Sequence, residues 1–337
     1  MKTPPPQSRA IAIWLFVIAA MILAMVVIGG ITRLTESGLS IMEWRPLSGF
    51  LPPFSAAEWE RVFALYKTIP EYQQLNRGMS LGEFKTIFWW EYVHRLWGRL
   101  IGLAFALPLA WFLLRRRVPR GLAPHLFAML ALGAAQGALG WFMVTSGFGQ
   151  RTDVSQYRLV AHLALALAIY GYVLWIAFGL LGRRALPPVG AALRRPLLLV
   201  LCLLGATVIL GGFTAGLDGG MVYNSFPLMG DRFAPADLWI MSPLWLNFFE
   251  NPPAAQFAHR WLAVATVIAI LALWIGAGRN RGLPIHLLAL FALLQASLGL
   301  ATLLLVVPIP LAALHQAGAV LLLGTAVWAL RAASEPR

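Results

Sequence analysis

The 337-residue sequence predicts an all-α polytopic membrane protein: eight transmembrane helices formed by the tandem duplication of a four-helix bundle. Hydrophobic residues make up 60% of the chain and charged residues 12%. Several apolar runs approach the ~20 residues that cross a bilayer as a helix. Motifs also repeat between the two halves. We expect helices at about 11–31, 87–114, 122–144, 158–182, 197–216, 256–277, 284–306 and 309–331.

Basic and acidic residues separate along the chain, and this separation predicts the topology. The short connections at 113–121, 182–196 and 278–282 carry arginine and no acid, whereas the long segments 32–86 and 217–255 hold most of the acidic residues. The positive-inside rule places the short connections and both termini in the cytoplasm and the long segments outside. Topology therefore accounts for the net charge of +13, and no nucleic-acid partner is expected.

Two further expectations concern single segments. No small-residue cleavage site follows the first apolar run, so we expect that run to be a retained helix and not a removed signal peptide. The single cysteine, Cys202, is expected to be a small buried hydrophobic side chain.

The repeated motifs relate the two halves residue by residue. GGITRLTESGLS at 29–40 parallels GGFTAGLDGGMV at 211–222, and AAQGALGWFMV at 134–144 parallels LLQASLGLATL at 293–303. An even number of helices in each copy gives both copies the same orientation in the membrane.

Four histidines occupy matched positions near the outer ends of predicted helices: His94, His162, His259 and His315. The duplication aligns His94 with His259 and His162 with His315, so each half of the bundle could hold one bis-histidine site. Haem fits such a site best, because its iron needs only two axial ligands from the protein, whereas zinc or copper would draw on Cys, Asp or Glu. The alternative for any single histidine is a packed, hydrogen-bonded side chain.

The halves differ beside the first histidine of each pair. Glu91 precedes His94 by three residues on the same helical face, and the second copy has Gln256 there. A carboxyl group at this depth is costly unless it is paired or functional. It could accept a proton or stabilise positive charge on a substrate; alternatively it forms an ion pair with Arg95 or Arg99. The asymmetry favours a catalytic first half and an electron-transferring second half. The candidate catalytic residues are Glu91, His94 and His162.

Arginines follow these histidines closely, and the first outer segment is long. Arg95 and Arg99 in the first half and Arg260 in the second could pair bidentately with haem propionates, or extend toward the interface. A capping-box pattern from Ser55 to Glu58 predicts one or two short helices over the first-half site.

A family resemblance is carried by the segments 29–53, 91–99, 211–231 and 256–260. The chain resembles the haem A synthase family over essentially its whole length. The resemblance implies oxidation of a ring methyl of haem O to a formyl group by two successive hydroxylations and loss of water, giving haem A for terminal oxidases. It implies a substrate site at His94 and His162 in residues 1–182, with Glu91 as the family's essential glutamate, and a haem b site at His259 and His315 in residues 183–337.

The first outer segment contains no cysteine, so the chain resembles the cysteine-free branch of proteobacteria and mitochondria. A thiol relay is thereby excluded, and the electron donor stays open. The expected location is the bacterial inner membrane, with the haem sites toward the periplasm. Haem O synthase is an expected partner, and the family suggests self-association. The rival functions are a di-haem cytochrome b that only transfers electrons from quinol, and haem transport or chaperoning.

Overall fold

The computed structural model describes residues 6–45, 48–182 and 186–335, and these residues form helices and connections without a β-strand. Eight of the described helices are long and apolar enough to cross a membrane, as the sequence predicts. They are α1 (Pro6–Leu34), α4 (Leu81–Leu114), α5 (Ala123–Val144), α6 (Gln156–Leu181), α7 (Arg194–Gly216), α9 (Pro252–Gly276), α10 (Leu283–Leu304) and α11 (Ile309–Ser334). Three shorter helices lie in the long segments: α2 (Ala56–Tyr66), α3 (Pro70–Gln74) and α8 (Asn247–Glu250).

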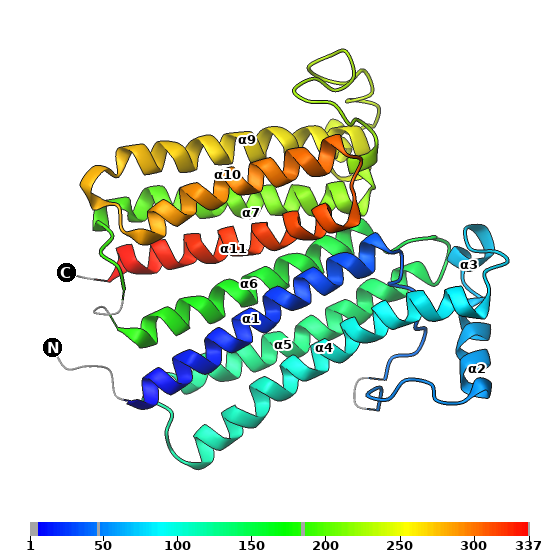
Figure 1. Cartoon of the computed structure of the whole chain (residues 1–337), viewed down its shortest axis with the longest axis horizontal. Coiled ribbons are helices and arrows are strands. Elements are labelled where there is room, and N and C mark those ends of the chain that lie inside the picture. Colours follow the sequence, from blue (N-terminus) through cyan, green and yellow to red (C-terminus); the bar gives the residue numbers. More distant parts are fainter. Residues whose placement is uncertain (1–5, 46–47, 183–185, 336–337) are drawn as a thin grey trace.

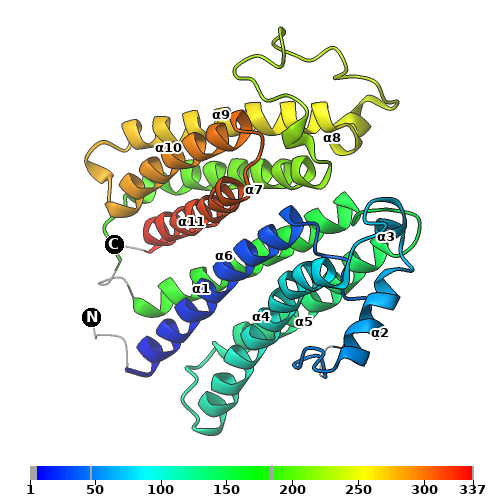
Figure 2. The same cartoon turned by 45° about the vertical axis from the view of Figure 1, so that its right-hand side comes forward.

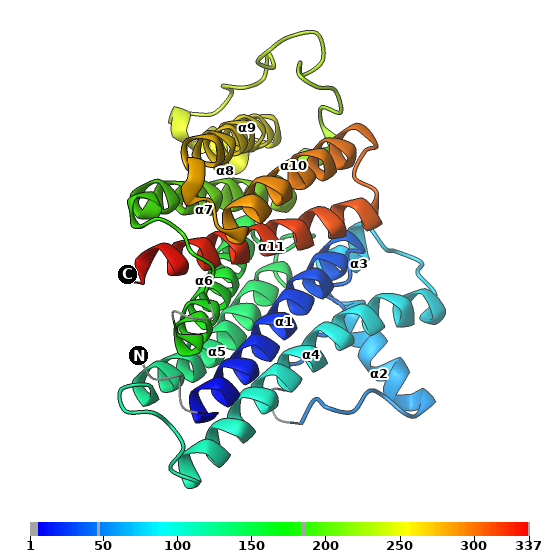
Figure 3. The ribbon, with the colours of Figure 1, turned by 60° about the vertical axis from the view of Figure 1, so that its left-hand side comes forward.

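The long helices lie side by side in two groups of four (Figure 1). Helices α1, α4, α5 and α6 form one group and α7, α9, α10 and α11 the other, and the separation is clear from two further directions (Figure 2 and Figure 3). The groups meet where α1 and α6 pack against α11 and where α6 packs against α7. Helix α1 begins and α11 ends at the same end of the bundle, while α2, α3 and α8 lie at the opposite end.

Each group has its own hydrophobic core, and the two cores join through α11. In the first, buried side chains of α1, α4 and α6 pack together with Val320 and Val327 of α11. The Trp14 indole satisfies its N–H inside this core by donating to the Ala104 carbonyl at 2.9 Å. The expectation of a buried cysteine is wrong: Cys202 is exposed on the surface of α7. Outward faces of membrane helices are apolar as well, so hydropathy does not separate buried from lipid-facing positions.

The ends of α1 and α7 repeat one local structure, as the matched motifs suggest. Glu36 and Asp218, the acids aligned in sequence, both adopt left-handed backbone conformations with φ of 51° and 50°. Arg33 then links the groups, because its guanidinium donates to the Asp218 carboxylate at 2.8 Å and to the Ala215 carbonyl at 3.1 Å. The two aligned acids therefore share one backbone conformation, and the duplication itself stays a prediction.

Helix α4 begins six residues before the predicted start, at Leu81 and not at residue 87. A second capping box causes the early start: the Ser80 hydroxyl accepts from the Glu83 N–H at 3.3 Å, and the Glu83 carboxylate accepts from the Ser80 N–H at 2.7 Å. Six residues add ~9 Å of helix. This extension is the platform on which α2 rests.

The segment before α4 folds against the first turns of that helix. We call α2, α3 and these first turns of α4 the cap. The predicted capping box of α2, from Ser55 to Glu58, is present. Trp59 and Phe63 of α2 pack their rings against Phe88 and Phe84 of α4, each with ring centroids 4.8 Å apart. Aromatic packing therefore holds α2 against α4 at the end of the first group opposite the chain termini, where the sequence predicts one or two short helices.

Glu71 of α3 is a buried acid inside this cap, with 3% of its surface exposed. Burial raises the pKa of Glu71 to about 8, a hydrogen bond from Tyr66 opposes the rise, and the nearby negative charges of Glu91, Glu36 and Asp153 add to it. One carboxyl oxygen, Oε2, has no hydrogen-bond partner among the described residues. Glu71 is therefore mainly a neutral carboxylic acid at pH 7.

The cap should loosen as the pH rises. The pKa of Glu71 in the folded cap, about 8, exceeds the ordinary value of 4.5, so its contribution to stability is complete below pH 4.5 and is lost as the pH approaches 8. Tryptic cleavage after Lys67 should therefore accelerate between pH 6 and pH 9 relative to Glu71→Gln, whose amide does not ionise. Dividing the cleavage rate of the wild-type chain by that of the variant at each pH removes the pH dependence of trypsin itself. An equal ratio at both values would contradict the prediction.

Candidate functional site

The four histidines lie in the half of α4, α6, α9 and α11 that is nearer to the start of each helix. His162, His259 and His315 fall within about two turns of the start of their helices, and His94 lies about two turns deeper in α4 because that helix extends into the cap. The structure brings the rings together in the predicted pairs. His94 lies within electrostatic range of His162, and His315 within that of His259.

Each histidine ring packs against a glycine of a neighbouring helix. A Cβ atom placed on Gly29 would lie 3.1 Å from the His94 ring, on Gly140 2.9 Å from His162, on Gly211 2.8 Å from His259, and on Gly299 2.7 Å from His315. Real Cβ atoms do not approach other atoms below 3.0 Å, so three of these sites require the ring to shift if the glycine is replaced. The glycines occupy matched positions in the two halves, and glycine permits this close approach of helices within a membrane.

The donor set suits a ligand that brings most of its own coordination. The described residues contain no group of three or more His, Cys, Asp or Glu side chains that could hold a bare metal ion. A pair of imidazoles is the protein contribution that a haem iron needs, because the porphyrin supplies the other four nitrogens.

Two glutamines, which sequence reasoning used only as markers of the duplication, contact the second histidine of each pair. The Gln295 amide lies 3.0 Å from Nδ1 of His315 and donates to the His315 carbonyl at 2.8 Å. The Gln136 amide lies 3.2 Å from Nδ1 of His162 and donates to the His162 carbonyl at 3.0 Å. A matched polar residue in two strongly apolar helices is the signal that could have identified them.

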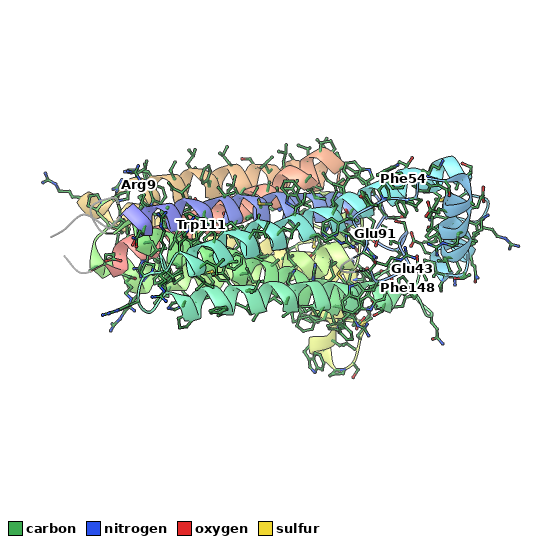
Figure 4. All side chains as sticks on the ribbon, turned by 90° about the horizontal axis from the view of Figure 1, so that it is seen from below. Arg9, Glu43, Phe54, Glu91, Trp111 and Phe148 are labelled. Atoms are coloured by element: carbon green, nitrogen blue, oxygen red, sulfur yellow. The ribbon has the colours of Figure 1, made fainter. Side chains whose placement is uncertain are left out.

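Glu91 is almost fully buried, with 2% of its surface exposed, and every acceptor position of its carboxylate is used. Oε2 accepts from the Ser40 hydroxyl at 2.7 Å and the Ile41 N–H at 2.6 Å. Oε1 accepts from Nε and Nη2 of Arg95 at 3.0 and 2.5 Å. Of the two interpretations left open by the sequence, the structure contains the ion pair, formed with Arg95. Figure 4 shows Glu91 and Glu43 at the capped end of the bundle and Arg9 at the other.

The arginines of the first half attach the outer segment to α4. Arg95 donates to the carbonyls of Ile41 at 2.6 Å and Glu43 at 2.9 Å, in addition to its ion pair. Arg99 donates to the Arg45 carbonyl at 2.7 Å. Sequence reasoning missed this binding of loop carbonyls. The contact of Arg95 and Arg99 with a substrate stays a prediction.

The second half repeats this attachment without the carboxylate. Arg260 donates to the carbonyls of Ser225 at 2.9 Å and Leu228 at 3.2 Å, and to Oε1 of Gln256 at 3.2 Å. Gln256 in turn donates to the Tyr223 carbonyl at 3.0 Å. The guanidinium of Arg260 is buried, its Nε has no partner, and no acidic side chain pairs with it among the described residues. A buried cation of this kind suits an anionic group of a ligand, such as a haem propionate.

Comparisons with known proteins agree with these features. The model of the family described as cytochrome oxidase assembly protein matches residues 12–327. The haem A synthase of Rhodospirillum centenum is 52% identical over 335 residues, which covers 97% of this chain and 89% of that protein. The haem A synthase of Parvibaculum lavamentivorans is 48% identical, with coverage of 96% and 94%, and that of Nitrosospira multiformis is 47% identical, with coverage of 95% and 92%. The chain therefore belongs to the haem A synthase family of cytochrome oxidase assembly proteins.

Proposed function

We propose that this chain is a haem A synthase, an oxidoreductase of the bacterial inner membrane that converts haem O to haem A. The reaction oxidises one ring methyl to a formyl group by two successive hydroxylations, followed by loss of water. The observation that carries the proposal is the pairing of two similar bis-histidine sites with different neighbours: Glu91 with Arg95 in one half, and Gln256 with Arg260 in the other.

The second half is proposed to hold haem b through His259 and His315. The fit is supported by the Nδ1 atom of His259, which lies 2.9 Å from the Thr207 carbonyl, because a proton shared with that oxygen leaves Nε2 free as a ligand. The unpaired Nε of Arg260 is a further donor for an anionic substituent. Haem b bound here would supply one-electron transfer to the reaction.

The first half is proposed to bind the substrate, haem O, between His94 and His162, with entry from the surrounding lipid. Glu91 then acts as a fixed negative charge. Its oxygens already accept four hydrogen bonds, and of its two predicted roles this fixed geometry favours stabilising positive charge at the methyl carbon. Arg95 and Ser40 fix the position of that charge.

We further propose that both termini face the cytoplasm and that both sites lie toward the periplasm. The arginine-rich connections between the long helices support this orientation. Haem O synthase is the proposed partner that delivers the substrate, and a membrane reductant supplies the electrons.

Haem extraction tests the proposed function directly. Membranes that contain this chain and a supply of haem O should yield haem A, whereas membranes with haem O alone should not. Chromatography of the acid-extracted haems measures the conversion. Retention of haem b together with unaltered haem O would point instead to an electron-transferring di-haem cytochrome or a haem carrier.

Replacing Glu91 by Gln should reduce conversion of haem O by about 100-fold, the usual scale for removing one preorganised electrostatic group. Haem b should stay bound, because the second half makes no contact with Glu91 through a described hydrogen bond. Glu58→Gln, in an exposed helix cap, is the matched control and should convert haem O normally. A Glu91→Gln variant that accumulates haem A at the wild-type rate would exclude the role proposed for Glu91.

Gly299→Ala should lower the amount of haem b that copurifies with the chain. The added Cβ would lie 2.7 Å from the His315 ring and force that ring to move. Gly137→Ala, at a helical glycine where a Cβ meets nothing within 4 Å, should retain haem b. The ratio of haem b to protein, measured by absorbance, gives the comparison, and equal ratios in the two variants would argue against His315 as a ligand.

A further inference from the structure

We infer that hydrogen bonds behind the histidine rings distinguish a permanent haem site from an exchangeable one, and that Gln295 is the positioning residue that holds His315 in its ligand orientation. This inference rests on the proposed assignment of haem b to the second half and haem O to the first. It adds an account of why one pair retains its haem while the other must release a product.

Both rings of the second half are anchored at the same nitrogen. Nδ1 of His259 lies 2.9 Å from the Thr207 carbonyl, and Nδ1 of His315 lies 3.0 Å from the Gln295 amide. The Thr207 carbonyl accepts from Nδ1 of His259 and so leaves Nε2 of that ring open to iron, whereas the Gln295 amide nitrogen donates to Nδ1 of His315 and places that ring's proton on Nε2. Rings held in this way have lost their rotational freedom before the ligand arrives, which favours tight binding and slow release.

Gln295 restrains His315 at two points. Its amide contacts the ring at Nδ1 and also donates to the backbone carbonyl of the same residue at 2.8 Å, so ring and backbone are held by one group. The amide oxygen Oε1 is buried and has no partner among the described residues. It lies against Gly318 of α11, in space that a Cβ at Gly318 would occupy.

That unpartnered oxygen has a specific use once Nε2 is bound to iron. The ring proton must then reside on Nδ1, which needs a hydrogen-bond acceptor. A half-turn of the Gln295 amide presents Oε1 to Nδ1–H and gives this buried acceptor a partner, in exchange for the hydrogen bond to the His315 carbonyl. The glutamine thus provides a partner for either tautomer of the neutral ring. Binding of haem selects the tautomer in which Oε1 accepts from Nδ1–H.

The histidine rings of the first half are held less firmly by hydrogen bonds. The Gln136 amide nitrogen lies 3.2 Å from Nδ1 and 3.4 Å from Nε2 of His162, so it does not single out one nitrogen. The His94 ring has no hydrogen bond within the described part of the chain, whereas its counterpart His259 has the Thr207 carbonyl. The looser restraint of these two rings lowers affinity and raises the dissociation rate, as a site that admits haem O and releases haem A requires.

The test is a titration of the purified, haem-depleted full chain with haem b, followed by absorbance and by redox titration of the bound haem. Gln295→Leu removes both amide contacts and should weaken haem b binding ~10–100-fold. Gln295→Glu keeps an acceptor and should retain haem b while lowering its midpoint potential, because a carboxylate accepts a stronger hydrogen bond from Nδ1–H. Wild-type affinity and potential in both variants would overturn the inference.

Matched variants separate this role from a general effect on the fold. Ser297→Ala, on the same helix and exposed, should bind haem b as wild type does. Gln136→Leu should leave haem b binding unchanged and weaken haem O binding by a smaller factor than Gln295→Leu weakens haem b. An equal or larger factor would overturn the distinction between the halves. If Gln295→Leu does not fold, the midpoint potential of Gln295→Glu decides alone.

The results of the binding and redox titrations do not depend on catalysis. Failure of the wild-type chain to form haem A would reject the proposed function and leave the titrations interpretable. Normal haem A formation with unchanged haem b affinity in Gln295→Leu would reject only the role of Gln295.

Discussion

The close approach of each histidine ring to a glycine is the contact on which the site depends. Inside a bilayer, neighbouring helices gain little from the hydrophobic effect, and their separation is set by the size of the residues between them. Gly140 and Gly299 leave the space in which His162 and His315 lie. The same small residue therefore allows tight helix packing and admits an imidazole into the bundle, four times at the same end of the molecule.

The long outer segments are held to the helices by a second repeated device, an arginine that binds loop carbonyls. Arg95 and Arg260 do this in matched positions, so each segment is fixed above its own histidine pair. Backbone carbonyls near the membrane surface gain charged donors, and the arginines are satisfied without an acid at every site. The fourth residue before each arginine then sets the local charge: Glu91 neutralises Arg95, whereas Gln256 leaves Arg260 cationic.

The cap adds a constraint that only the first half has. Helices α2 and α3 rest on an extension of α4, and their aromatic side chains cover its outer turns. Glu71 lies buried in this cluster as a neutral acid, and the nearby negative charge of Glu91 contributes to raising its pKa. The cap and the Glu91–Arg95 ion pair therefore both belong to the half that we assign to the substrate.

Hydropathy, charge and repetition determined much of this protein from its sequence: eight spanning helices, the pairing of His94 with His162 and His259 with His315, and the difference between Glu91 and Gln256. The spanning helices follow from local composition, because a membrane helix is identified by its length and apolarity. The histidine pairs follow from the repeated motifs. Only the tertiary structure decided what the polar groups contact. The hydrogen bonds from Ser40 and Ile41 to Glu91, the loop carbonyls on Arg260 and the amide of Gln295 behind His315 all join residues far apart in sequence. Hydrogen-bond partners of that kind are fixed by packing, which no local pattern encodes.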